Sequence, residues 1–324
     1  MSVRLDRLAR AGLATAFAAA ILPAAAQNYP EPRRPVTIIV PYAPGGGTDT
    51  AARLMAAGLE RELNATFQVI NRAGAASQIG LTELARAKPD GMTLAYAILP
   101  TVVTHYRDPK RQAPYTRASF QPVVTHYIST MTLSVRGDSP YRSLREFVEA
   151  ARAAPGRLTV SDSGLLGTPH TTTLLLQGVT GAKFTAVHFT GGQPSVMALL
   201  GGHVDALAGG VSDALPHWRS GQFRVLGIAA EVPDPAMPEV PTMRAQGFDV
   251  ISASIGMLVA PAGTPRAIVD TLAQTARRVV ADGDHVAKLT DFGSAVYFHG
   301  PDEAAAIWQA TEQRLTPLLE QLER

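Results

Sequence analysis

The stretch Val40-Pro41-Tyr42-Ala43-Pro44-Gly45-Gly46-Gly47-Thr48-Asp49-Thr50 marks the point where a strand gives way to a helix. An apolar, β-branched segment, residues 35–40, precedes it, and apolar residues recur at helical spacing over residues 51–61. Glycine allows a tight turn and a close approach of backbone N–H groups to a ligand. Thr48 is placed to be the N-cap, and the first turn of a helix carries unpaired N–H donors. The stretch therefore predicts a βα unit whose turn can seat an anion.

Two known phosphate-binding patterns do not fit this turn, and a plain structural turn is the alternative to an anion site. No Gly-Lys-Ser/Thr follows the glycines, so the turn is not a P-loop. Its spacing also differs from the Gly-x-Gly-x-x-Gly of dinucleotide-binding folds. The predicted anion is therefore a small carboxylate rather than a nucleotide.

The first 26 residues predict an export signal. Arg4, Arg7 and Arg10 form a basic start, a short apolar run occupies residues 11–22, and Ala24-Ala25-Ala26 supplies the small residues of a cleavage site. The apolar run is short for a membrane anchor. We expect cleavage after Ala26 and a periplasmic mature protein.

Composition narrows the class of protein further. The chain has 324 residues and no cysteine, so disulfides cannot stabilise it after export. Residues 1–26 contain three of the 29 basic and one of the 27 acidic residues, which leaves the mature chain with no formal net charge. Neither this balance nor any basic run predicts a nucleic-acid partner, and no later segment has the length of a membrane span.

Strands and helices alternate from residue 35 onward, which predicts parallel, doubly wound α/β sheets. Ligands of such sheets bind beyond the carboxyl ends of the strands. Two long β-rich segments, residues 122–135 and 250–259, interrupt the alternation and are expected to cross between two lobes. The predicted division is residues 27–126 and 254–324 in lobe 1 and residues 127–253 in lobe 2, with a two-strand hinge.

Several motifs in this order resemble the Bug (TctC-like) receptors, the periplasmic solute-binding proteins of tripartite tricarboxylate transporters. They are Pro41–Arg53, Asn71–Ala75 with Gly80, Pro89–Leu94, Gly164 with His170, Gly191 with Leu199–Asp205, Pro238–Thr242 and Ala260–Pro265. The resemblance implies a type II periplasmic-binding (flytrap) fold that closes on a small organic acid. It also implies a carboxylate held by backbone N–H groups and water rather than by a dedicated arginine, delivery to transporter membrane subunits, a monomeric protein and no cofactor.

The predicted binding residues lie in the loops that would meet between the lobes. In the first lobe they are Tyr42, Gly45, Gly46, Gly47, Thr48, Asp49, Gly74, Ser77 and Thr101; in the second they are Ser163, Gly167, Thr168, His170, Gly191, Gly192 and Asp205. Thr168 is also expected to cap a helix, with Pro169 in its first turn, and Pro194 to open the next one. For Asp49, an ion pair with Arg53 is favoured over a ligand contact. His188 stands where the family has proline, and a pH-sensitive contact is a hypothesis for it.

No catalytic or metal-binding role is predicted. The eight histidines form no zinc-binding spacing, and no Gly-x-Ser-x-Gly elbow supports an exported hydrolase. A periplasmic sensor that passes its ligand state to a signalling partner uses the same fold and remains an alternative to a transport receptor.

Overall fold

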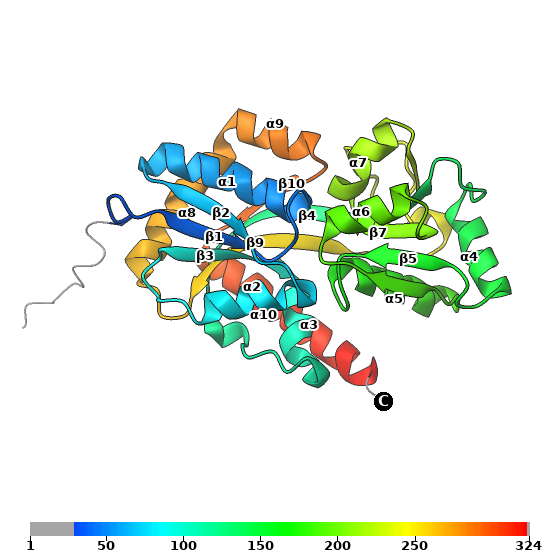
Figure 1. Ribbon diagram of the computed structural model, residues 1–324, viewed down its shortest axis with the longest axis horizontal. Helices are drawn as coiled ribbons and strands as arrows, with labels where there is room; N and C mark the ends of the chain where they lie inside the picture. The colour runs from blue at the N-terminus through cyan, green and yellow to red at the C-terminus, as the bar shows by residue number, and fades with distance from the viewer. Residues whose placement is uncertain (1–28, 323–324) are drawn as a thin grey trace, which may run out of the picture.

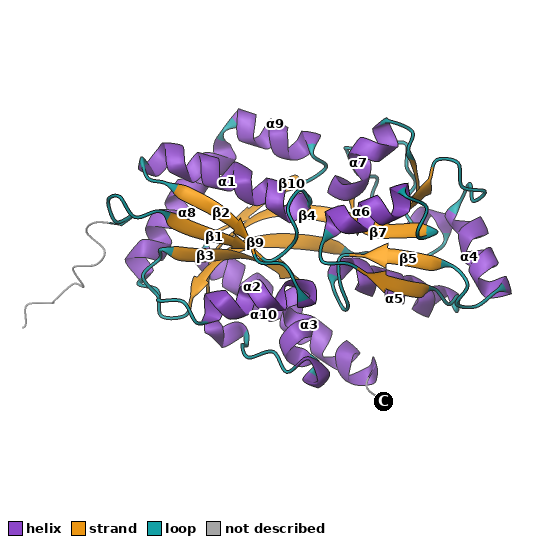
Figure 2. Cartoon of the chain, viewed as in Figure 1, coloured by secondary structure: helices purple, strands orange, loops and turns teal. Residues whose placement is uncertain are grey.

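The structure is a computed structural model that describes residues 29–322, so the predicted signal peptide lies outside the described residues. Two α/β lobes lie side by side, and two strands, β4 and β9, run along the middle of the molecule between them (Figure 1). Within each lobe the strands form a central layer with helices on both faces (Figure 2). Among the described residues, no helix has the length and apolar character needed to cross a membrane.

Lobe 1 is built on a mixed sheet whose order is β2-β1-β3-β9-β4, with β10 also paired to β4. Its strands are β1 (Val36–Val40), β2 (Phe67–Asn71), β3 (Thr93–Leu99), β9 (Ala253–Pro261), the first part of β4 (Phe120–Arg136) and β10 (Ala295–His299). The first three are parallel, as the alternating pattern predicts, whereas β9 and β10 are antiparallel to their neighbours.

The helices of lobe 1 bury their apolar faces on the two sides of this sheet. They are α1 (Gly47–Leu63), α2 (Gln78–Ala85), α3 (Thr101–Arg107), α8 (Arg266–Ala281), α9 (Gly283–Asp291) and α10 (Pro301–Leu322). On one face Met55 and Leu59 of α1 pack with Leu272 of α8, and all three side chains are fully buried. On the other face Leu84 of α2 and Trp308 of α10 belong to a second core cluster.

Lobe 2 repeats this arrangement with a smaller sheet of order β4-β7-β5-β6, and β8 also pairs with β4. Its elements are α4 (Leu144–Ala153), β5 (Thr159–Asp162), α5 (Thr168–Thr180), β6 (Thr185–His188), α6 (Gly192–Leu200), β7 (Ala206–Gly210), α7 (Val211–Arg219) and β8 (Phe223–Ile228). Phe147 of α4 and Leu176 of α5 share one core cluster, while Leu199 of α6 and Leu215 of α7 lie in two others.

The hinge is formed by the long strand β4 and by the start of β9. Residues up to Thr130 pair with β9, and residues from Met131 onward pair with β7 and β8. The chain returns at Ser252, which bonds to Met131 and to Ala229 immediately before β9 begins. The ring of Tyr127 lies directly against Gly256, where any side chain would overlap it. The two-strand connection predicted from the β-rich segments is confirmed.

Three elements and three helix starts differ from the sequence-based predictions. Helices α3 and α7 and strand β10 were not predicted; α7 contains Pro216, which normally ends a helix. The N-caps of α1 and α5 are Gly46 and Gly167, so the predicted caps Thr48 and Thr168 are wrong. Both hydroxyls instead bond elsewhere, to Tyr127 and Thr101 respectively. Helix α6 begins at Gly192, two residues before Pro194.

Candidate ligand-binding site

A pocket of about 60 Å³ lies between the two lobes. This volume is well below the roughly 300–1,000 Å³ of sites that hold drug-sized ligands, so the pocket in this conformation suits a small molecule. Its lining combines hydroxyl groups, backbone of glycine-rich turns and a few apolar side chains from both lobes. The lining residues outside the predicted set are Ala43, Ile98, Tyr127, Ser129, Met131, Pro169, Gly210, Ser212, Asp213 and Ser254.

Four helices of at least nine residues begin at this pocket. The first residues of α1, α5 and α6 line it, as do Gly210, Ser212 and Asp213 at the start of α7. Each helix start carries the positive end of the helix dipole, although at α5 the Thr168 N–H already donates to Thr101 and Pro169 has no N–H. Converging helix starts therefore create a positive potential in a pocket that contains no lysine or arginine side chain among its lining residues.

The structure brings nine of the sixteen predicted residues to the pocket: Tyr42, Gly46, Gly47, Thr48, Asp49, Thr101, Ser163, Thr168 and Gly192. Gly45, Gly167, His170 and Gly191 are next to lining residues in the chain but do not line the pocket, whereas Gly74 and Ser77 lie in a loop that contributes no lining residue. Asp205 is different, because it lies at the opposite end of β7 from Gly210 and its carboxylate accepts hydrogen bonds from Thr159. The structure thus separates Asp205 from the other predicted residues.

Asp213 is the most informative lining residue that the sequence analysis missed. Strand β7 ends in Gly209-Gly210 and is followed directly by α7, which resembles the strand–glycine–helix pattern of the stretch at residues 40–50. That pattern was a usable signal, but Pro216 concealed the helix. The Tyr127 and Ser129 side chains lie on β4, and their position in the pocket depends on the path of the hinge.

Asp49 has its hydrogen-bonding capacity taken up by lobe 1. Its carboxylate accepts from Arg53 Nε at 3.0 Å, from Asn71 Nδ2 at 2.9 Å and from the Gly45 N–H at 3.0 Å. Burial raises the pKa of Asp49, but these donors outweigh burial and hold the pKa below its usual range. The predicted ion pair with Arg53 is present. By accepting the Gly45 N–H as well, Asp49 chiefly stabilises the conformation of the glycine turn.

Direct contacts hold the two lobes together around the pocket. The Oγ1 atoms of Thr101 and Thr168 are 2.9 Å apart, and the Thr168 N–H donates to Thr101 Oγ1 at 2.9 Å. Thr104 Oγ1 donates to the Leu166 carbonyl at 2.8 Å, and the Ala43 N–H donates to the Thr190 carbonyl at 3.1 Å. The described conformation is therefore closed.

Arg111 adds a charged contact between the two lobes. Its guanidinium donates to the Ala75 carbonyl in lobe 1 and to the Leu165 carbonyl in lobe 2, and 9% of its side chain is exposed. Burial lowers the pKa of Arg111. Burial also raises the pKa of the nearby Tyr42 to about 12, so Tyr42 is a neutral hydroxyl at neutral pH.

Asp213 extends from the start of α7 toward lobe 1. Its Oδ2 accepts the Gly210 N–H at 3.1 Å, and the Gly47 N–H at the start of α1 faces the same carboxylate. Burial raises the pKa of Asp213, while these two N–H groups act in the opposite direction. No lysine or arginine forms an ion pair with Asp213 among residues 29–322.

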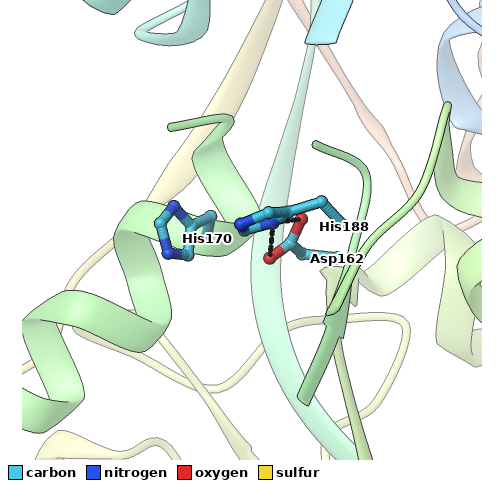
Figure 3. A group of neighbouring side chains, drawn as sticks. All are labelled: Asp162, His170 and His188. Atoms are coloured by element: carbon cyan, nitrogen blue, oxygen red, sulfur yellow. Dashed lines mark hydrogen bonds and ion pairs between the residues drawn. The ribbon is translucent and has the colours of Figure 1, made fainter. Parts of the chain in front are cut away.

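Asp162, His170 and His188 form a cluster in lobe 2, next to the loop that contributes Ser163 (Figure 3). Nδ1 of His188 lies 2.9 Å from both carboxylate oxygens of Asp162, and the His170 and His188 rings meet edge to face. Burial raises the pKa of Asp162 and lowers that of His170 to about 4. His188 is about one-third exposed.

The same three residues offer possible metal ligands within 4.8 Å of one another. However, the Leu166 N–H donates to His170 Nδ1 at 3.0 Å, which leaves the proton of the neutral ring on Nε2. Coordination by His170 Nε2 would require loss of that proton, and coordination by Asp162 would compete with its hydrogen bond to His188. His170 Nδ1, His188 Nδ1 and the Asp162 carboxylate thus have hydrogen-bond partners within the protein. The absence of a metal stays a prediction.

Comparison with known proteins identifies the family. A family model described as "Tripartite tricarboxylate transporter family receptor" matches residues 51–323. The chain is 31% identical to a Cupriavidus necator protein named "UPF0065 protein in gbd 5'region", over 97% of this chain and 96% of the relative. This extent of similarity covers both lobes and the hinge.

Solved structures agree with this assignment. MatC from Rhodopseudomonas palustris with bound malate is 31% identical, with a TM-score of 0.84 over 89% of this chain and 99% of that one. R. palustris Rpa4515 with adipate is 28% identical, with a TM-score of 0.85 over 90% of this chain and 97% of that one. The matched family consists of receptors, which confirms the prediction of a non-enzymatic binding protein. The chain belongs to the tripartite tricarboxylate transporter receptor family and is a periplasmic solute-binding protein with the fold of the Bug and TctC proteins.

Proposed function

We propose that this protein captures a small organic acid between its lobes and delivers it to the membrane subunits of a tripartite tricarboxylate-type transporter. The observation that carries the proposal is the convergence of four helix starts on one small interlobe pocket. Helix starts bind carboxylates through backbone N–H groups without a basic side chain. The malate bound to MatC and the adipate with Rpa4515 are small carboxylates of the kind that this chemistry selects.

In this mechanism the acid first docks on lobe 1 at Tyr42, Gly46–Thr48 and Thr101. Lobe 2 then closes over it with the helix starts at Thr168 and Gly192, through bending of the β4 and β9 connection. Closure makes the contacts of Thr101 with Thr168 and of Arg111 with Leu165. The closed form would present a surface made from both lobes to the transporter, and the open form would not.

Thermal melting against a panel of mono-, di- and tricarboxylates, amino acids and aromatic acids tests the binding step. A ligand at one hundred times its Kd stabilises the folded state by about 2.7 kcal/mol, which raises Tm by several degrees. Isothermal titration then gives the stoichiometry, expected to be one per chain. If no acid of any class raises Tm, the proposed function is wrong.

A cellular uptake assay tests the delivery step. Deletion of the gene should abolish uptake of the acid that the purified protein binds, and the wild-type gene should restore it. Normal uptake in the deletion strain would contradict the transport role while leaving acid binding intact.

A further inference from the structure

The charge of Asp213 is not balanced by any basic side chain, in contrast to that of Asp49. Asp49 is paired with Arg53 and also bonded to Asn71. Asp213 Oδ2 accepts the Gly210 N–H at 3.1 Å, and the Gly47 N–H acts on the same carboxylate, so the donors that face Asp213 are neutral backbone groups. His217 follows one turn later on α7, but its Nδ1 lies 2.9 Å from Gln222 Oε1.

This carboxylate lies inside the ligand pocket rather than on the outer surface. Asp213 lines the pocket, and its Oδ1 lies so close to Gly192 that a Cβ there would overlap it. The side chain therefore occupies the space between the starts of α1, α6 and α7. It also occupies the Gly47 N–H, one of the donors expected to seat a ligand carboxylate.

An unpaired carboxylate in so small a pocket disfavours a ligand that carries only negative charge. Two like charges at contact distance repel more strongly in the partly water-excluded interior of a protein than they do in water. The starts of α5 and α6, at Thr168 and Gly192, nevertheless favour a carboxylate in the same pocket. One end of the pocket thus attracts negative charge, and Asp213 attracts positive charge.

We propose that Asp213 is an ammonium-binding group and that the ligand is a small amino acid or another amino-carboxylate. The ligand carboxylate would bind at the start of α6, where the positive end of the α5 dipole also faces the pocket, and its ammonium group would bind Asp213. An ammonium has three donors, and the hydroxyls of Ser129 and Ser212, which lie 3.5 Å apart in the pocket lining, supply two further acceptors. This inference rests on the proposed function and specifies its ligand class.

The competing arrangement has a protonated Asp213 donating a hydrogen bond to a dicarboxylate. The two arrangements predict opposite responses to removal of the charge. Asn at position 213 retains a carbonyl oxygen for the Gly210 N–H and an N–H₂ donor, but it cannot neutralise an ammonium. Asp213→Asn should therefore harm amino-carboxylate binding selectively if the proposal is right.

The experiment uses isothermal titration of the purified mature protein with matched pairs of probes. The pairs are L-alanine with propionate, L-aspartate with succinate and L-glutamate with glutarate, whose members differ by one ammonium group; all standard amino acids and a panel of nitrogen-free acids complete the set. We expect at least one amino acid to bind the wild type more tightly than its nitrogen-free partner. Asp213→Asn should weaken the binding of that amino acid by at least about 30-fold. The affinity for its nitrogen-free partner should stay unchanged or increase.

Glu239→Gln is the matched control, because it removes one exposed negative charge from lobe 2 outside the pocket. Equal unfolding midpoints for the unliganded wild type and Asp213→Asn would show that the variant is folded. If only nitrogen-free acids bind, or if Asp213→Asn weakens both members of a pair equally, the inference is overturned and the proposed function stands. If no compound of either class binds, both the inference and the proposed function are wrong.

Discussion

The hydroxyls of Thr101 and Thr168 meet across the cleft, with their Oγ1 atoms 2.9 Å apart. Thr101 is the first residue of α3 in lobe 1, and Thr168 is the first residue of α5 in lobe 2. Both residues are almost fully buried in the closed conformation. If the lobes separated, both hydroxyls would become accessible to water and would lose their hydrogen bond to each other. Closure of the cleft therefore buries these two polar groups and requires that they pair.

Thr101→Val should weaken ligand binding by favouring the open form. It removes the acceptor of the Thr168 N–H and leaves that group and the Thr168 hydroxyl without their partner. A buried polar group left unpaired costs about 1–3 kcal/mol, which corresponds to about 5- to 150-fold in Kd. Titration with the identified acid measures this. Thr173→Val is the control, since its hydroxyl bonds within α5; an equal loss in both variants would contradict the prediction.

Gly47→Ala should obstruct closure without weakening lobe 1. A Cβ at position 47 would lie 2.6 Å from Ser212 Oγ, which belongs to the opposite lobe. Such overpacking costs about 1–3 kcal/mol, again about 5- to 150-fold in Kd. The double variant Gly47→Ala/Ser212→Ala removes the clashing oxygen and should bind as tightly as Ser212→Ala alone. If Gly47→Ala weakens binding equally in the wild-type and Ser212→Ala backgrounds, the clash is not the cause.

Asp49→Asn should reduce stability at neutral pH but not in acid. The folded-state pKa of Asp49 is lowered by Arg53, Asn71 and the Gly45 N–H against the effect of burial. The stabilisation is therefore present above the unfolded pKa near 4 and is lost as the pH falls through the folded pKa. Urea unfolding should show a loss of about 1–3 kcal/mol at pH 7 that shrinks toward pH 3.

The exposed pair of Arg266 with Asp270 offers the control for Asp49. Asp270→Asn should change the unfolding free energy by at most about 1 kcal/mol, because solvent screens surface ion pairs. A loss at Asp49 that persisted undiminished at pH 3 would show that the carboxylate charge is not responsible.

His105→Asn should make stability less dependent on pH between 7 and 5. His105 is fully buried, its Nδ1 lies 2.8 Å from the Tyr115 hydroxyl, and burial lowers its pKa to about 3. The unfolded chain binds a proton below about pH 6.5 that the folded chain does not, so stability falls as the pH falls. At pH 5 this histidine alone accounts for about 2 kcal/mol of the loss.

The test for His105 is to measure the difference in unfolding free energy between pH 7 and pH 5. This difference should be smaller by about 2 kcal/mol in His105→Asn than in the wild type. This difference is independent of any uniform loss of stability caused by the substitution. The exposed His203 is the control position, replaced by Gln. Identical pH dependence in the two variants would contradict the assignment.

The fold followed from local patterns that can be recognised in the sequence. Strand β1, the glycine turn and α1 are specified by the apolar run at residues 36–40, by Gly45–Gly47 and by the amphipathic segment after them. Helix α4 is specified locally in the same way, because the Ser143 side chain accepts from the Glu146 N–H at its start and its buried residues repeat at helical spacing. The long strand β4 could be recognised because its β-rich segment interrupts the alternation of strands and helices.

Helix α7 was missed because its local sequence contradicts its structure. Pro216 lies within it, and a helix can contain this residue here because Val211, Ala214 and Leu215 are buried against β8 and the chain that follows. Tertiary packing overrides propensity in this way wherever an apolar face is fully buried. The omission of α7 concealed Asp213.

Sequence alone therefore determined the class of the protein and the stretches of the glycine turns at Gly45–Gly47 and Gly191-Gly192, because turns and helix starts depend on near neighbours. Only the tertiary structure decided which of these groups share one pocket. It placed Asp213 against Gly47 and removed Asp205 to the far end of β7, although both are acidic residues close to the same strand. The physical reason is that a pocket between two lobes depends on contacts among residues distant in the chain, which the local pattern around each residue does not encode.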